Sequence, residues 1–328
     1  MSSSVQYTPK NILITGGCGF IGSNYILYML KHYKDVHIVN VDNLNYCSTK
    51  DLLTNTDKYT FICSSINHYE TIKFLLIQYK IDTIVHFAAQ THVDNSFKNS
   101  INFTMDNILG THNLLEVCRE YGKIGRFIHI STDEVYGEVD INNEGCMEKS
   151  LLNPTNPYAA TKAAAEFLVK SYYHSFKLPV IITRGNNVYG SRQYPEKVIP
   201  AFISKLLSGE KCNVQGKGDS IRNFIHVEDV SRAIETIMLK GEINEIYNIG
   251  TKNEFSVLQI LEKLVSEIKS SDDYLQYANF VDDRLFNDFR YSINNDKLKM
   301  LGWDETIDFS NGLKDTIEWY KTNTNFFK

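Results

Sequence analysis

The sequence of 328 residues lacks a long hydrophobic run, a close pair of cysteines and an excess of basic residues. No apolar stretch approaches the roughly 20 residues that a membrane-spanning helix needs, and the polar segment 1–10 has no apolar core like that of a signal peptide. The six cysteines are scattered without a Cys-x-x-Cys spacing, which is typical of a reduced protein and not of a disulfide scaffold or a zinc site. We therefore expect a cytoplasmic protein that binds neither a membrane nor a metal.

The charge balance is mildly acidic, with a formal net charge of −5 at pH 7 and a pI near 6.0. Nucleic acids attract strongly basic surfaces, so a nucleic acid is not an expected partner. The hydrophobic content of 43% is ordinary for a soluble protein, and the length allows one large or two modest domains.

Short apolar segments alternate with helical patterns through the first 190 residues. We expect strands at 11–15, 36–41, 59–63, 83–87, 126–130 and 180–184, and helices from just after 22 to about 32, and at about 68–79, 102–121 and 158–176. Strands that alternate with helices at this spacing indicate the α/β class, with a Rossmann-type doubly wound parallel sheet.

A glycine-rich loop follows the first predicted strand. Gly16, Gly19 and Gly22 precede a helix, an arrangement that lets the backbone approach a pyrophosphate at the helix N-terminus. The second strand is followed by Asp42, whose carboxylate can bind ribose hydroxyls and would repel a 2′-phosphate. The spacing therefore predicts a dinucleotide site that prefers NAD to NADP.

The alternation of strands and helices becomes irregular after residue 190. Helices are expected at 195–208, 227–240, 257–269, 294–301 and 310–321, and a strand at 245–250 should return to the sheet. We assign residues 10–190, with a return segment at about 226–250, to an NAD-binding Rossmann domain. Residues 191–225 and 251–328 are assigned to a smaller C-terminal substrate-binding lobe, and the substrate is expected in the cleft between the two.

Two acidic residues follow the strand at 126–130. Thr132, Asp133 and Glu134 lie at its carboxyl end, where open α/β sheets bind ligands. Neighbouring carboxyl groups in one cleft should differ in pKa, which would supply one acid and one base. The structural alternative is a polar loop in which Asp133 caps the next turn.

Tyr158 and Lys162 are four residues apart on a helix that Asn156 and Pro157 open as N-cap and first-turn proline. A nearby ammonium, like a positive nicotinamide ring, should lower the pKa of the tyrosine. Such a tyrosine can take a proton from a substrate hydroxyl while hydride leaves the same carbon.

Several segments resemble the extended short-chain dehydrogenase/reductase superfamily and, within it, the nucleotide-sugar 4,6-dehydratases. They are 15–22, 86–94, 131–137, 157–162, 184–190, 195–197, 222–229 and 247–250. The resemblance extends from residue 11 to about 323. The related 4-epimerases typically have small residues at the positions of Asp133 and Glu134, so these two acids favour a dehydratase. A 4-epimerase and a non-catalytic NAD sensor are the alternatives.

The resemblance implies a mechanism. Tyr158, assisted by Lys162, removes the C4 hydroxyl proton as hydride passes to NAD, and Thr132 stabilises the C4 oxygen. Glu134 then removes the C5 proton while Asp133 protonates the departing C6 hydroxyl. Hydride returns to C6, so the net reaction is loss of water.

The resemblance also implies binding residues. Those for NAD are Gly16, Gly19, Phe20, Ile21, Gly22, Asp42, Asn43, Ser65, Ile66, Ala88, Tyr158 and Lys162. Those for the nucleotide sugar are Thr91, Asn187, Lys197, Arg222, Asn248 and Arg284. Asn187 and the two arginines would hold the diphosphate, and Lys197 would contact the nucleotide end. No metal site is expected, since His86 and His92 lack ligand partners at suitable spacing.

The chain departs from the family pattern in two places. Ser64-Ser65-Ile66 stands where the family usually has an aspartate before an isoleucine to hold the adenine, and Asn287 stands where bacterial members have a histidine. Segments 184–190 and 285–288 look more like the dehydratase domain of plant-type rhamnose synthases.

UDP-glucose is therefore the expected substrate, and dTDP-glucose is the alternative. Because the sequence ends at Lys328, we expect the product to pass to a separate downstream epimerase/reductase. By analogy with the family, the helices that begin near 102 and 158 should form a homodimer interface.

Overall fold

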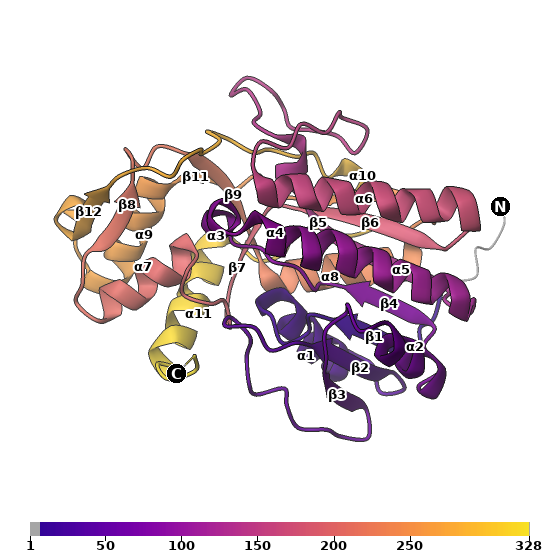
Figure 1. Ribbon diagram of the computed structural model, residues 1–328. Coiled ribbons are helices and arrows are strands. Elements are labelled where there is room, and N and C mark those ends of the chain that lie inside the picture. Colours follow the sequence, from indigo (N-terminus) through magenta and orange to yellow (C-terminus); the bar gives the residue numbers. More distant parts are fainter. Residues whose placement is uncertain (1–6, 328) are drawn as a thin grey trace.

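The computed structural model describes residues 7–327 and has a mixed α/β architecture (Figure 1). Its centre is a seven-stranded parallel sheet in the order β10-β6-β5-β4-β1-β2-β3. The strands are β1 (Asn11–Thr15), β2 (His37–Asp42), β3 (Tyr59–Cys63), β4 (Thr83–His86), β5 (Arg126–Thr132), β6 (Val180–Gly185) and β10 (Ile246–Ile249). Because β10 pairs with β6 at one edge, the predicted return of the chain to the sheet is confirmed.

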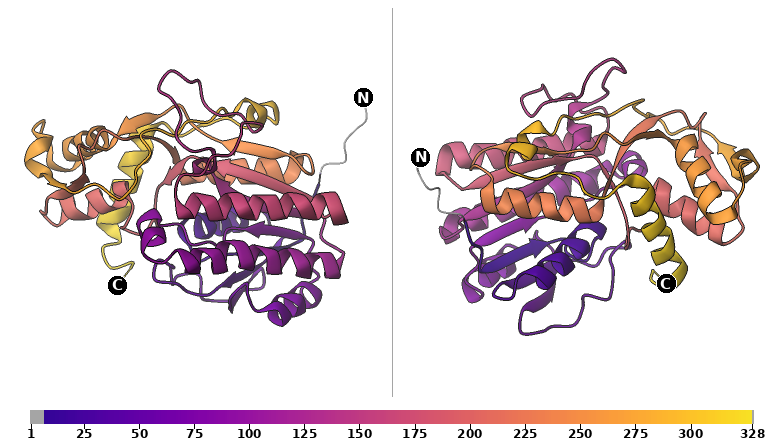
Figure 2. Two further views of the ribbon diagram at one scale, coloured as in Figure 1. Left: turned by 45° about the horizontal axis from the view of Figure 1, so that its top comes forward. Right: turned by 180° about the vertical axis from the view of Figure 1, so that it is seen from behind.

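Helices cover both faces of this sheet, as Figure 2 shows. On one face lie α1 (Phe20–His32) and α8 (Val227–Lys240), which share a core with Ile14 and Ile128. On the other face lie α2 (Tyr69–Gln78), α5 (Gly110–Tyr121) and α6 (Pro157–Phe176), packed around Leu13 and Phe127. Adjacent strand residues thus point to opposite cores, which confirms a doubly wound sheet buried on both sides.

A smaller lobe lies beyond the carboxyl edge of the sheet and has its own hydrophobic core. Its helices are α7 (Val198–Leu207), α9 (Val257–Lys269) and α11 (Phe309–Thr322). Its strands are β7 (Asn187–Tyr189), β8 (Cys212–Gln215), β9 (Ile221–His226), β11 (Glu254–Ser256) and β12 (Ala278–Val281), and a 3₁₀ turn spans Tyr274–Tyr277. The described residues contain no helix long and apolar enough to cross a membrane.

The single long helix predicted at 102–121 is wrong in detail. The segment begins within α4 (Ser100–Phe103), which follows α3 (Val93–Lys98), and a π-helical turn, Thr104–Leu109, precedes α5. The wider turn directs Asn107 inward, where its side chain accepts from Gln90 N at 2.7 Å and donates to Thr161 Oγ1 at 2.9 Å. Such π-turns commonly occur beside functional sites, and this one fixes the strand-to-helix connection next to the cavity described below.

The short helix α10 (Asp296–Met300) packs against the sheet domain although it falls in the range predicted for the lobe. Leu298 and Trp303 belong to the same core as α1 and α8. The Trp303 indole also donates to Asp229 O at 3.1 Å. We therefore propose that residues 296–303 be grouped with the NAD-binding domain.

A buried ion pair fastens α6 to the sheet. The Arg184 guanidinium contacts the Glu166 carboxylate at 2.6 Å, and the two side chains are 3% and 1% exposed. Arg184 also donates to the Tyr136 hydroxyl at 2.8 Å and lies over that ring. Since α6 carries Tyr158 and Lys162, the Arg184–Glu166 ion pair helps to fix the position of both residues relative to the sheet.

Removal of one partner should destabilise the fold. Arg184→Met leaves the Glu166 charge buried and unpaired, so the free energy of unfolding in urea should fall by about 3–5 kcal/mol. Lys73→Met, which breaks the exposed Lys73–Glu120 pair, should change stability little. Equal effects of the two substitutions would show that the buried pair does not hold α6 in place.

Candidate active site

A cavity of about 670 Å³ lies between the carboxyl edge of the sheet and the smaller lobe. Its walls include the glycine loop after β1, the end of β5 with Glu134 beyond it, the first turns of α6, and lobe residues such as Lys197 and Arg222. Open α/β sheets bind ligands at this edge. The cleft predicted between the two parts of the chain is therefore present.

The glycine loop forms one end of the cavity. Gly16 has φ +71°, and a Cβ there would lie 2.6 Å from the backbone of Ala88. A Cβ on Gly22 would lie 2.5 Å from Gly16 O. No side chain fits at these positions, so the backbone at the start of α1 stays open to the cavity. This cradle fits the pyrophosphate of a dinucleotide.

Asp42, at the end of β2, forms the next part of the same edge. One carboxylate oxygen accepts from Cys18 N at 2.9 Å and the other from Leu44 N at 2.8 Å. Burial raises the pKa of Asp42 above its ordinary value. The predicted NAD residues line the cavity together: Gly16, Gly19, Phe20, Ile21, Gly22, Asp42, Asn43, Ser65, Ile66, Ala88, Tyr158 and Lys162.

The two carboxyl groups after β5 occupy different environments. Thr132 Oγ1 accepts from Glu134 N at 3.3 Å and opens a 3₁₀ turn, Asp133–Tyr136. Glu134 lines the cavity and accepts from Asn156 Nδ2 at 3.0 Å. Asp133 is 3% exposed behind the cavity wall, where it accepts from Asn186 Nδ2 at 2.7 Å. Asp133 is thus buried more deeply than the sequence suggested.

Burial and the neighbouring Glu134 carboxylate raise the pKa of Asp133 to about 7. Burial also raises the pKa of Glu134, while the positive charge of Lys197 opposes that rise. At neutral pH, Asp133 therefore has a substantial protonated fraction. The pKa of both carboxyl groups is therefore raised, and the division of roles between an acid and a base stays a prediction.

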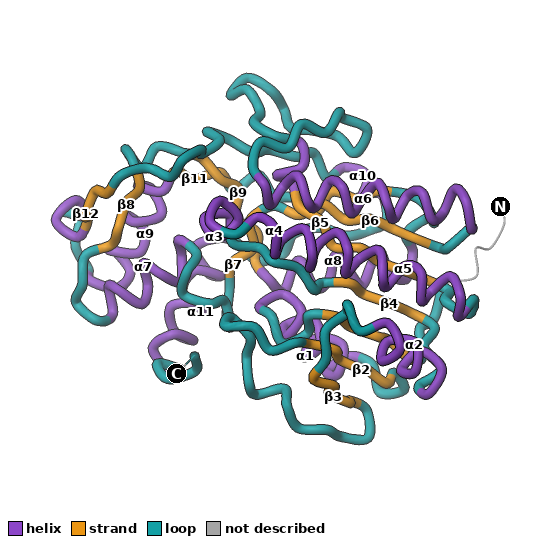
Figure 3. Tube along the Cα trace, in the orientation of Figure 1, coloured by secondary structure: helices purple, strands orange, loops and turns teal. Residues whose placement is uncertain are grey.

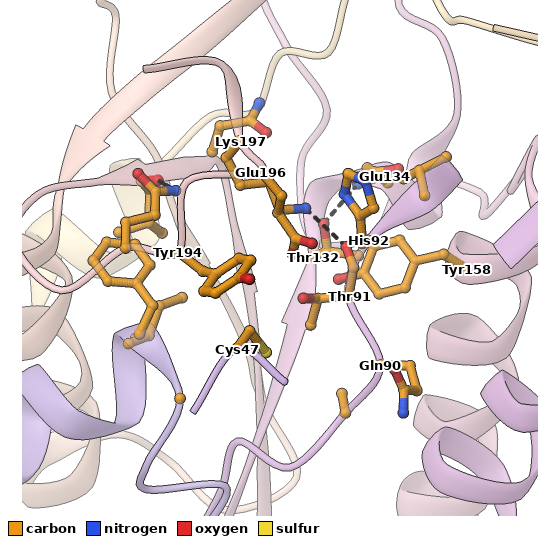
Figure 4. Close-up of a pocket in the computed structure, with 18 of the residues that line it drawn as sticks. Cys47, Gln90, Thr91, His92, Thr132, Glu134, Tyr158, Tyr194, Glu196 and Lys197 are labelled. Atoms are coloured by element: carbon orange, nitrogen blue, oxygen red, sulfur yellow. Dashed lines mark hydrogen bonds between the residues drawn. The ribbon is translucent and has the colours of Figure 1, made fainter. Parts of the chain in front are cut away.

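Tyr158 and Lys162 lie on the first turns of α6, which the Asn156 side chain caps by accepting from Ala159 N at 2.9 Å. Lys162 Nζ donates to Ile130 O at 2.6 Å, and burial lowers the pKa of Lys162 to about 8. Figure 4 shows Tyr158 beside Thr132 and Glu134.

The expected lowering of the tyrosine pKa is not produced by the protein's own side chains. Burial, followed by the charge of Glu134, raises the pKa of Tyr158 above its ordinary value. The Lys162 ammonium is engaged by the Ile130 carbonyl. The favourable charge that a tyrosine base needs must therefore come chiefly from a cationic ring bound beside it.

Five of the six predicted substrate residues line the cavity: Thr91, Asn187, Lys197, Arg222 and Arg284. Lys197 Nζ donates to Thr91 O at 2.9 Å, and its charge acts on Glu134. The charge of Lys197 therefore acts on the Glu134 end of the cavity, and its contact with the nucleotide stays a prediction.

The two arginines are held in place by polar neighbours. Arg222 lies over the Tyr291 ring and donates to Asn287 Oδ1 at 2.9 Å. Arg284 donates to Gln215 Oε1 at 2.9 Å. Asn287, one of the positions where the chain departs from bacterial dehydratases, thus orients a predicted diphosphate ligand.

Asn248 is not a substrate ligand. It is fully buried on β10, does not line the cavity and accepts from the Tyr136 hydroxyl at 2.9 Å. Its amide donates to Cys146 O and Asn294 O at 2.9 Å. Asn248 therefore ties β10 to the long loop 137–156 that rises beside α6 (Figure 3).

Asn156 and Asn186 hold the two carboxyl groups, yet the sequence analysis did not name either as a site residue. Asn156 was recognised only as a helix cap, and Asn186 lies inside the resembling segment 184–190. The sequence contained no signal that these amides donate to Glu134 and Asp133, because the contacts join residues 22 and 53 positions apart.

Fold and cavity together define an extended short-chain dehydrogenase/reductase. The family described as GDP-mannose 4,6 dehydratase matches residues 13–316, and the chain belongs to this family of nucleotide-sugar 4,6-dehydratases.

The chain is 45% identical over 361 residues to a dTDP-D-glucose 4,6-dehydratase of Dictyostelium discoideum, covering 97% of this chain and 83% of that protein. It is 48% identical over 322 residues to a trifunctional UDP-glucose 4,6-dehydratase, 3,5-epimerase and reductase of Arabidopsis thaliana. That match covers 97% of this chain but spans 48% of the plant protein. A crystal structure of a Streptomyces venezuelae dTDP-glucose 4,6-dehydratase with NAD bound is 34% identical, with a TM-score of 0.91 over 97% of this chain and 100% of that one.

Proposed function

We propose that the protein is an NAD-dependent UDP-glucose 4,6-dehydratase, which converts UDP-glucose to UDP-4-keto-6-deoxyglucose and water. The observation that carries this proposal is the pair of carboxyl groups beside Tyr158, with Glu134 in the cavity and Asp133 behind it. A 4-epimerase needs no acid and base beyond the tyrosine, and an NAD sensor needs neither. Both alternatives leave this buried, hydrogen-bonded pair without a role.

The first stage is oxidation at C4. The glycine loop and Asp42 would hold NAD, which would supply a hydride acceptor for C4 and a hydride donor for C6. Tyr158 takes the proton of the C4 hydroxyl; Lys162, held by the Ile130 carbonyl, adds to the positive charge of the bound ring in favouring the tyrosinate. The Thr132 hydroxyl is placed to hydrogen-bond the C4 oxygen as charge develops on it.

The second stage is elimination of water. The C4 ketone acidifies the C5 proton, which the Glu134 carboxylate removes; Asn156 fixes this carboxylate and Lys197 favours its ionised form. Asp133, with a pKa near 7, supplies the proton with which the C6 hydroxyl leaves as water. Glu134 afterwards returns its proton to C5 as hydride reaches C6, so Glu134 acts twice and Asp133 once in each turnover. The proton that Tyr158 took from the C4 hydroxyl balances the one that Asp133 gives to the departing water.

The choice of UDP-glucose has weaker support than the reaction. Relatives named for UDP-glucose and for dTDP-glucose are 48% and 45% identical to this chain. The preference for UDP-glucose is supported by the resemblance of segments 184–190 and 285–288 to plant-type rhamnose synthases. We also propose that an epimerase and a reductase of the kind named in the plant relatives consume the product.

We further propose a homodimer in the cytoplasm. Large apolar side chains are exposed along the π-turn and α6: Ile101 (70%), Met105 (46%), Leu109 (45%) and Phe167 (63%). A second copy that covers these side chains would remove an apolar surface from water. The six free cysteines are compatible with a reducing compartment.

Substitution of the carboxyl groups should separate oxidation from elimination. The double variant Asp133→Asn with Glu134→Gln should form no dehydrated product, yet its absorbance at the wavelength of reduced nicotinamide should rise in a single turnover with UDP-glucose. Tyr158→Phe should show neither the absorbance change nor product. Dehydration by the double variant at near the wild-type rate would show that these carboxyl groups do not carry the elimination.

The pH profile should reveal the Asp133 proton. Because Asp133 must be protonated to act as the acid, the rate of elimination should fall as pH rises through about 7. A UDP-glucose analogue with fluorine at C6 needs no proton to release fluoride. Its pH–rate profile should therefore lack the fall in rate, the alkaline limb, that loss of the Asp133 proton causes. Identical alkaline limbs for the two substrates would assign the limb to another group, such as Lys162, whose pKa is about 8.

The nucleotide preference is decided by comparing kcat/KM for UDP-glucose and dTDP-glucose. One methyl group and one hydroxyl distinguish the two, and each is worth about 1–3 kcal/mol in a fitted pocket. We expect roughly tenfold preference for UDP-glucose. Asn287→Ala, which loosens Arg222, should raise KM for both substrates equally. A preference for dTDP-glucose would refute the assigned nucleotide and leave the dehydratase intact.

A further inference from the structure

The geometry of the sheet edge places the adenine of the cofactor beside residues 64–66. The glycine loop after β1 receives the pyrophosphate and Asp42 after β2 receives the ribose, so the base lies beyond them, at the end of β3. β3 pairs with β2 in the register Asp42 to Cys63, and Ser64 N donates to Asp42 O at 3.0 Å. Ser64, Ser65 and Ile66 all line the cavity at this end.

The two serines differ in how their hydroxyl groups are used. Ser64 Oγ is engaged by its neighbours, Ser65 O at 3.4 Å and His68 Nδ1 at 3.1 Å. Ser65 Oγ accepts one bond, from Asn67 N at 3.1 Å. Among residues 7–327 it makes no other hydrogen bond, so its proton and a second lone pair remain available to a ligand.

The turn that carries Ser65 is held in place by contacts with α5. Ile66 is buried against Gly110, where a Cβ would lie 2.6 Å from Ile66 Cδ1. The Ile66 carbonyl also accepts from Asn113 Nδ2. Ile66 therefore supplies an apolar surface for a flat base, and Ser65 is held beside it at the rim.

A serine and a carboxylate recognise different purines at this position. The amino group at C6 of adenine donates hydrogen bonds, whereas the carbonyl oxygen at C6 of hypoxanthine accepts them. A carboxylate only accepts, so it binds the amino group and repels the carbonyl oxygen. A hydroxyl can accept from the former or donate to the latter.

We propose that Ser65 recognises the C6 substituent of the cofactor's purine, and that the enzyme consequently binds dinucleotides with a 6-oxopurine nearly as tightly as NAD. The inference rests on the use of NAD in the proposed function and extends it to the choice of base. Ser65 is thus a specificity-determining residue whose hydroxyl makes the adenine site permissive.

The test compares dissociation constants for NAD and nicotinamide hypoxanthine dinucleotide by isothermal titration of cofactor-free protein. The wild-type protein should bind the two within about threefold of each other. Ser65→Asp and Ser65→Asn form a matched pair of nearly equal shape. The aspartate should increase the preference for NAD at least tenfold, whereas the asparagine, which keeps a donor and an acceptor, should leave the ratio near that of wild type. Ser65→Ala should weaken both ligands by a similar factor.

Three results would overturn the proposal: wild-type protein that rejects the hypoxanthine dinucleotide more than tenfold, equal ratios for the aspartate and asparagine variants, or unchanged binding of both ligands by Ser65→Ala. Circular dichroism of each variant verifies that it is folded, and the asparagine and alanine variants still decide the matter if the aspartate does not fold. The titrations contain no sugar nucleotide. A failure of the proposed dehydration would instead appear in the product assay of the wild-type enzyme.

Discussion

The burial of Asp133, Tyr158 and Lys162 beside the half-buried Glu134, at the junction of β5 and α6, is the constraint on which the site depends. Four ionisable groups in so small a volume are stable only if each finds a polar partner. The protein provides one to each of three: Asn186 to Asp133, Asn156 to Glu134 and the Ile130 carbonyl to Lys162. The positions of β6 and of the N-cap of α6 are therefore tied to the chemistry.

The same burial determines what these groups can do. Removal from water disfavours every charged form, which raises the pKa values of both carboxyl groups and of Tyr158 and lowers that of Lys162. A carboxyl group that holds a proton near neutral pH can act as an acid, and positive charge beside Tyr158 would oppose the effect of burial on its pKa.

Much of the fold follows from local sequence, because strand-helix alternation and caps are local signals. The predicted bounds of β1, β3, α8 and α9 agree with the structure residue for residue. The predictions failed at positions whose structure or role depends on contacts with residues far away in the sequence. The π-turn depends on hydrogen bonds of Asn107 with Gln90 and Thr161. Asn248 lies in a segment that resembles the family, yet its side chain is hydrogen-bonded to residues 136, 146 and 294. The catalytic residue types were visible in the sequence, whereas the amides that hold them were not.

The central claim is that one hydride leaves C4 and returns to C6 of the same sugar while water is lost. Its most direct test is the dehydration of UDP-glucose or dTDP-glucose, whichever is turned over, labelled with deuterium at C4. The account predicts a 4-keto-6-deoxy product that carries the deuterium in its C6 methyl group. Release of the deuterium to solvent, or a product that retains it at C4, would contradict the account.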